Sequence, residues 1–113
     1  MATRYFIAIP DPDAARAAGE FAFTAHGAEA FALELQEALR NDRLFQRWLA
    51  TQDEPDEVDP LLSATDPAAS VSGTQRETRV ELVANTSLRG DVFKHRLRLL
   101  AGSAWELRDV RAG

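Results

Sequence analysis

Residues 28–40 carry an apolar stripe at helical spacing. The stripe is made by Ala28, Phe31, Ala32, Leu35, Ala38 and Leu39. Charged and amide side chains occupy the opposite side, and Leu33 lies off the stripe. A helix with one apolar side must bury that side against another element. The segment therefore predicts an amphipathic helix packed on a sheet or on other helices.

A second, shorter helix is expected directly after it. Asn41 and Asp42 can end the first helix and cap a new one. The apolar residues of segment 42–50 then fall on one side, at positions Leu44, Phe45, Trp48 and Leu49. We therefore expect two consecutive helices, over 28–40 and about 42–50.

The N-terminal segment is read as a β-hairpin. Residues 5–9 form a short apolar, partly β-branched run, and residues 20–24 carry two phenylalanines. Between them, Asp11 can cap a single helical turn that has Pro12 at its first position and Gly19 as its terminator.

The C-terminal third is read as a three-stranded meander. Residues 78–85 alternate between apolar and polar side chains, as in a half-buried strand. As a helix, residues 92–100 would place Arg96 in the middle of an apolar arc, so a strand is favoured. Paired strands would also form a ladder of Glu81, Arg98 and Glu106. The competing interpretation is a helix over 91–101 that ends at Gly102.

Together these segments predict an α+β fold in the order ββααβββ. An antiparallel sheet, made of the N-terminal hairpin and the C-terminal meander, would carry the two helices on one face. The 113 residues are expected to form one domain. Residues 51–73, acidic and interrupted by prolines, are expected to form a long loop within it.

Composition narrows the classes of function. The chain has no cysteine, which excludes disulfides and thiolate chemistry, and its net charge is −5. An acidic protein repels nucleic acid and anionic membranes, so we expect neither as a partner. The excess of arginine over lysine and the abundance of alanine are typical of GC-rich bacterial genomes. Without a signal peptide or a spanning segment, the expected location is the cytoplasm.

No motif for a cofactor or metal is present. The acidic segment 53–59 fails the calcium-loop pattern, because Pro55 and Val58 occupy positions that need a ligand and a glycine. We therefore expect no cofactor and no metal site.

Four residues are candidates for a ligand site. In the strand interpretation, His95 lies on the apolar face opposite Asp109, and a His–Asp pair in a cleft can act as a general base. Trp105 would line the same space between the helices and the sheet. His26, followed by Gly27 at the start of the first helix, is the fourth candidate.

Two basic rows are candidates for an anion-binding or partner-binding surface. Arg40, Arg43 and Arg47 would form one ridge if the two helices ran on continuously. Lys94 and Arg96 would form a second row on the open face of the sheet.

These observations favour a small, non-catalytic interaction or accessory module that forms a homodimer. The alternative is a small-molecule-binding protein or an enzyme, whose pocket would lie between helices and sheet near His95 and Asp109. The sequence names neither a substrate nor a partner.

Overall fold

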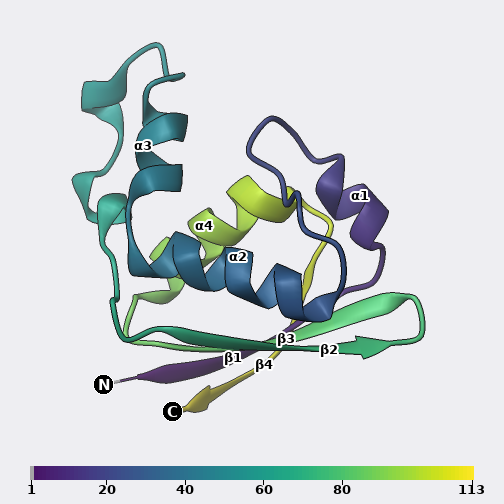
Figure 1. Ribbon diagram of the computed structural model, residues 1–113. Coiled ribbons are helices and arrows are strands. Elements are labelled where there is room, and N and C mark those ends of the chain that lie inside the picture. The colour runs from purple at the N-terminus through teal and green to yellow at the C-terminus, as the bar shows by residue number, and fades with distance from the viewer. Residues whose placement is uncertain (1) are drawn as a thin grey trace.

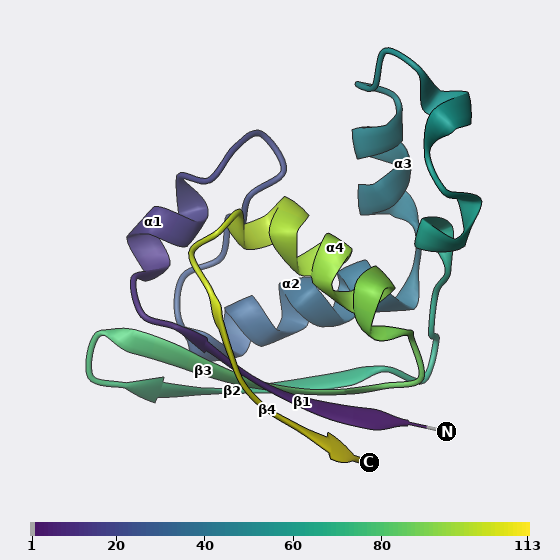
Figure 2. The same ribbon diagram turned by 180° about the vertical axis from the view of Figure 1, so that it is seen from behind.

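A computed structural model describes residues 2–113 as two layers: a four-stranded antiparallel sheet with helices on one face (Figures 1 and 2). No helix of these residues is long and apolar enough to span a membrane. The strands are β1 (Thr3–Ile9), β2 (Ser70–Arg76), β3 (Arg79–Thr86) and β4 (Glu106–Ala112). The helices are α1 (Pro12–Arg16), α2 (Ala28–Arg40), α3 (Arg43–Leu49) and α4 (Gly90–Ala101). Two 3₁₀ turns, Pro55–Glu57 and Pro60–Ser63, follow α3.

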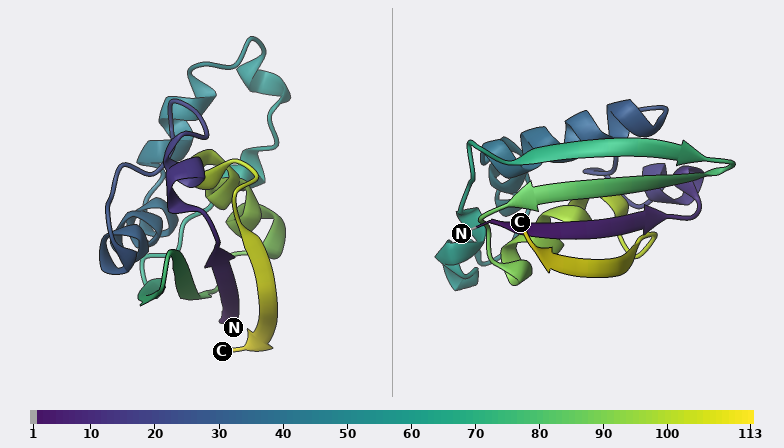
Figure 3. Two further views of the ribbon diagram at one scale, coloured as in Figure 1. Left: turned by 90° about the vertical axis from the view of Figure 1, so that its right-hand side faces the viewer. Right: turned by 90° about the horizontal axis from the view of Figure 1, so that it is seen from below.

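The strand order is β2-β3-β1-β4, and every neighbouring pair is antiparallel. Helices connect β1 to β2 and β3 to β4, so two β–α–β units interleave in one sheet. This is the split β–α–β topology of ferredoxin-like folds. It leaves β2 and β4 as the two edges, which the view of the sheet from below displays (Figure 3, right).

Several predictions are confirmed. The fold is α+β with an antiparallel sheet and helices on one face. The helix predicted over 28–40 has those bounds, and its six stripe residues are all buried. Asp11 caps α1 by accepting the N–H of Ala14, with Pro12 as the first helical residue. Leu33 does lie off the stripe, and of the two outcomes open to such a residue, exposure or cover by another element, the structure shows exposure, at 60%.

The order ββααβββ is confirmed only in part: the two consecutive helices are present, but the strands before and after them differ. Residues 20–24 form a loop rather than a strand; Thr24 donates its N–H to Glu34 of α2, and Phe23 turns into the core. The long loop ends earlier than expected, because residues 70–76 form β2. The order that the structure shows is β1, α1, α2, α3, β2, β3, α4, β4.

The strand predicted over 92–100 is also wrong, because these residues belong to α4. The helix ends at Gly102, whose φ of 60° and N–H bond to the carbonyl of Arg98 terminate it. The competing helical interpretation is the correct one. The ladder of Glu81, Arg98 and Glu106 therefore does not exist: Glu81 pairs with Arg76 and Arg79, and Glu106 pairs with Arg108.

Arg96 is the residue that made the apolar pattern of residues 92–100 favour a strand over a helix. Its side chain does fall within the apolar arc of α4, and it is completely buried. Its guanidinium donates to four carbonyls: Nη1 to Ala38 (2.5 Å) and Asn41 (3.5 Å), Nη2 to Leu62 (3.0 Å) and Ala64 (2.5 Å). The first two carbonyls end α2 and the other two end the second 3₁₀ turn. Buried polar groups need such partners, so α4 can contain this arginine because other chain ends surround it.

The core lies between α2, α4 and the concave side of the sheet. Tyr5 of β1 stacks on Phe93 of α4 with ring centroids 4.2 Å apart. Phe23 and Phe31 lie 4.5 Å apart at the other end of the helical layer. Buried strand residues such as Ile7 and Leu82 complete a continuous cluster.

Asp66 fastens the long loop to the sheet. Its carboxylate accepts hydrogen bonds from the Thr86 hydroxyl (2.8 Å), the Ser87 N–H (2.9 Å) and the Ala68 N–H (3.0 Å). Its own N–H donates to the carbonyl of Leu39. Burial raises the pKa of Asp66, but these hydrogen bonds lower it by more, and its net pKa lies below the ordinary value.

Asp66→Asn is expected to destabilise the protein at neutral pH by about 1–3 kcal/mol, since a charged acceptor of three donors is lost. A lowered pKa means that the ionised form stabilises the fold. This contribution is complete above about pH 4 and is lost as the pH falls through the folded-state pKa. Urea unfolding of both proteins from pH 7 to pH 2 measures it. A difference between them that stays constant over this range would contradict the assignment.

Candidate functional site

The four candidate ligand residues do not form one site. His95 lies on α4, where its ring packs edge-on against Trp48 (centroids 4.5 Å apart) and near Phe45 (6.0 Å). Burial lowers the pKa of His95, and the charges of Arg96 and Arg98 lower it further. This environment belongs to a neutral histidine packed among aromatic rings.

Asp109 and Trp105 have other neighbours. Asp109 lies on β4 opposite Phe6, and its carboxylate accepts a hydrogen bond from Arg111 Nε at 2.7 Å. That bond lowers the pKa of Asp109. Trp105 donates its indole N–H to the carbonyl of Gly102. The predicted pairing of His95 with Asp109 is wrong. It required residues 92–100 to form a strand, and these residues belong to the helix α4.

The two predicted rows of basic residues do not form the continuous surfaces that the sequence suggested. Arg40 donates from Nε to the carbonyl of Ala69 at 2.7 Å, whereas Arg43 and Arg47 lie on α3, beyond the break at Asn41. Lys94 and Arg96 belong to α4, so they are not on the open face of the sheet. Arg96 is buried, and no anion could reach its guanidinium.

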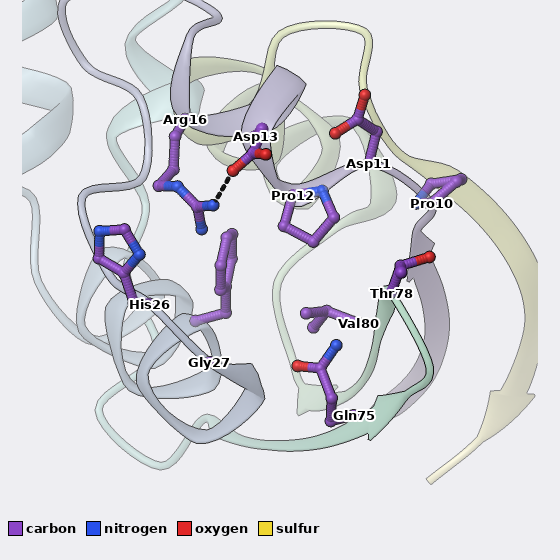
Figure 4. A pocket seen from close by; sticks show the side chains of 11 residues that line it. Pro10, Asp11, Pro12, Asp13, Arg16, His26, Gly27, Gln75, Thr78 and Val80 are labelled. Carbon is purple, nitrogen blue, oxygen red and sulfur yellow. Dashed lines mark hydrogen bonds and ion pairs between the residues drawn. The ribbon is translucent and has the colours of Figure 1, made fainter.

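A pocket of about 580 Å³ lies between α1, the start of α2 and the β2–β3 hairpin (Figure 4). We call it the hairpin pocket. Its polar walls are made by Asp11, Asp13, Arg16, His26, Gln75 and Thr78, and buried Phe31 and Val80 lie at its base. Of the four candidate ligand residues, only His26 lines it.

Most polar groups of the hairpin pocket already have partners within the protein. Asp11 caps α1, and Arg16 pairs with Asp13 and donates to the carbonyl of Ala25 (3.3 Å). Gln75 donates to the carbonyls of Glu77 (3.0 Å) and Arg79 (3.1 Å), which braces the hairpin. Among residues 2–113 no three His, Asp or Glu side chains are placed to hold a metal ion. Four of the six polar residues that line the pocket therefore already make contacts within the fold.

The two edges of the sheet differ in their protection. β4 carries four charged residues, and a register shift interrupts its pairing with β1. Both devices prevent another strand from adding to an edge. β2 pairs with β3 over seven residues without a shift, and its only charge, Arg76, stands at the hairpin end. It contains neither proline nor lysine, so the β2 edge lacks these defences.

The outward-facing backbone groups of β2 belong to its odd-numbered residues. Arg76 and Arg79 close the hairpin across a two-residue turn, so Arg76 faces β3 and alternate residues face outward. Two contacts agree with this assignment. Gln36 Oε1 accepts the N–H of Val71 at 3.1 Å, and Arg40 donates to the carbonyl of Ala69. Side chains of α2 thus cap the first part of the edge.

This capping ends at Leu33, one helical turn before Gln36, because a leucine side chain cannot form hydrogen bonds with the β2 backbone. On α2, Arg40, Gln36, Leu33 and Glu29 succeed one another at helical spacing along the side that faces the β2 edge. A groove of about 820 Å³ lies beside the uncapped part, lined by His26, Gly27, Ala28, Glu29, Ala30, Leu33, Gly73, Thr74 and Gln75. We call it the edge groove. It brings exposed Leu33 next to the outward groups of Gly73 and Gln75.

No family model, curated protein or solved structure matches the chain. Sequence reasoning missed this site because an edge is defined only by strand order. One signal was present, the position of Leu33 outside the stripe of α2.

Proposed function

We propose that this protein is a non-catalytic interaction module that binds an extended segment of a partner protein along β2. The observation that supports the proposal is that the outward backbone groups of β2 have side-chain partners at one end of the strand and none from α2 at the other. Outward groups at Ala69 and Val71 have side-chain partners on α2, whereas those at Gly73 and Gln75 face the edge groove.

Strand addition satisfies such groups directly. Main-chain hydrogen bonds to the edge supply affinity, and pockets for alternate side chains supply specificity. Here the edge groove gives the added strand a wall, α2, with an apolar contact at Leu33. The fold alone says nothing about function, since ferredoxin-like topologies serve many purposes. The proposal depends on the site.

The proposal predicts that Gln75→Pro weakens binding strongly and that Gln75→Ala does not. The Gln75 N–H faces outward, so proline removes a donor to the added strand and leaves the β3 ladder intact. Gln75→Ala loses the same brace on the hairpin but keeps the N–H. Random nine-residue peptides displayed on phage would be selected on the wild-type protein. The strongest synthetic peptide is then titrated into all three proteins by NMR.

We expect the Gly73 and Gln75 amides to shift and to exchange more slowly with peptide bound. Affinity should fall at least tenfold in Gln75→Pro and less than threefold in Gln75→Ala. The proposal is wrong if the selected peptides shift amides elsewhere, or if both variants bind as the wild type does.

A further inference from the structure

We infer that the segment taken by the edge groove runs antiparallel to β2 and carries a basic residue two positions before an apolar one. This inference rests on the proposed function and names the chemistry of its partner. It follows from the order of side chains along the groove, from the direction of the strands and from the placement of α2.

Helix α2 determines the order of the side chains along the edge groove. From the capped end near Val71 toward the hairpin, α2 presents Leu33 and then Glu29. Four helical residues span about 6 Å. Alternate side chains of a strand are about 6.6 Å apart. One side chain of an added strand can therefore contact Leu33 while the side chain two positions away lies beside Glu29.

The charge of Glu29 determines which side chain of the bound segment can lie beside it. Glu29 is exposed and is the only acidic residue that lines the groove. The whole chain carries −5, which favours a cationic partner at longer range. A lysine or arginine thus fits beside Glu29, and an aliphatic side chain fits on Leu33.

The direction in which the bound segment runs along β2 determines the order of the basic and the apolar residue in its sequence. All pairs in the sheet are antiparallel, and antiparallel pairing is slightly more stable per residue. A segment antiparallel to β2 passes the hairpin end first. It therefore meets Glu29 before Leu33, and its pattern from N to C terminus is basic, any residue, apolar.

The occupant is an extended segment rather than the β2 strand of a second copy. Figure 3, right, shows α2 extending past the β2 edge of the sheet. Two copies joined β2 to β2 would place both α2 helices on the same face. Paired strands lie about 4.8 Å apart, whereas packed helices need 8–10 Å between axes. A segment without its own helical layer avoids this collision.

Three acetylated and amidated peptides test the inference by NMR titration up to 5 mM. The first is Thr-Ser-Lys-Thr-Val-Ser-Thr, the second exchanges Lys and Val, and the third has Glu in place of Lys. We expect the first to bind about tenfold more tightly than the second, because the exchange removes both contacts. The Glu29→Lys variant should reverse the preference between the first and third peptides, and Leu33→Ala should weaken the first about threefold.

The outcomes separate the two proposals. Equal affinities for all three peptides, with Gly73 and Gln75 still shifting, would overturn the basic–apolar pattern and leave strand addition in place. Failure of every selected and synthetic peptide to shift those amides would overturn both. Sedimentation of the free protein as a dimer that Gln75→Pro dissociates would show that a second copy occupies the edge, which also overturns the inference.

Discussion

Arg96→Ala is expected to destabilise the protein by about 3–5 kcal/mol. The substitution removes the donor of the buried Ala38 carbonyl and of the partly buried carbonyls of Leu62 and Ala64, at about 1–3 kcal/mol for a buried unsatisfied group and less where water can enter. It also removes the contact of the guanidinium with the Phe45 ring, 5.7 Å from its centroid. Domains of this size are stable by about 5–15 kcal/mol, so much of the stability would be lost. Urea unfolding at pH 7 measures it.

Two further variants control this experiment. Arg98→Ala removes an exposed arginine from the same helix and should cost less than about 0.5 kcal/mol. Arg96→Lys keeps a charge but offers a single nitrogen where two donate to separate carbonyls, so an intermediate loss is expected. Burial lowers the pKa of the Arg96 guanidinium and the charge of Asp42 opposes this shift. If Arg96→Ala unfolded within 1 kcal/mol of the wild type, its role in joining α4 to α2 would be refuted.

Arg96 also shows where sequence reasoning fails. Periodicity located α2 well, because its burial pattern is local and all six stripe residues face one layer. For α4 the same test failed, since a charged residue in an apolar arc is normally a reason to reject a helix. The carbonyls that accept its hydrogen bonds come from segments 32 to 58 residues away, which no local pattern can reveal.

β2 was missed for a related reason. Its sequence has only one large apolar residue, Val71, and its exposed side consists of serine, threonine and arginine residues. What makes it a strand is pairing with β3, whose alternating residues were recognised. Because the sequence does not predict β2, it predicts neither the edge of β2 nor the groove beside it. The position of Leu33 off the apolar stripe of α2 could be read from the sequence, but the surface beside it could not.

Gly73→Ala is expected to cost about 2–3 kcal/mol, although alanine normally improves a strand by about 0.5–1 kcal/mol. A Cβ at Gly73 would lie 2.2 Å from the carbonyl oxygen of Ala28 and 2.8 Å from its carbon. These are backbone atoms at the start of α2, so relief requires the helix to move away from the sheet. Urea unfolding measures the loss, and NMR shifts of α2 amides report the displacement.

Gly19→Ala is the matched control for the same chemical change. No atom lies within 4 Å of the Cβ position at Gly19, so we expect no loss and a gain of up to about 1 kcal/mol from the unfolded chain. Equal stability of both variants would mean that α2 does not rest on β2 as closely as described. The close approach at Gly73 is also what brings the start of α2 over the edge and forms the edge groove. Gly73→Ala should therefore weaken peptide binding even where the protein remains folded, because one bare Cα supports both the packing and the site.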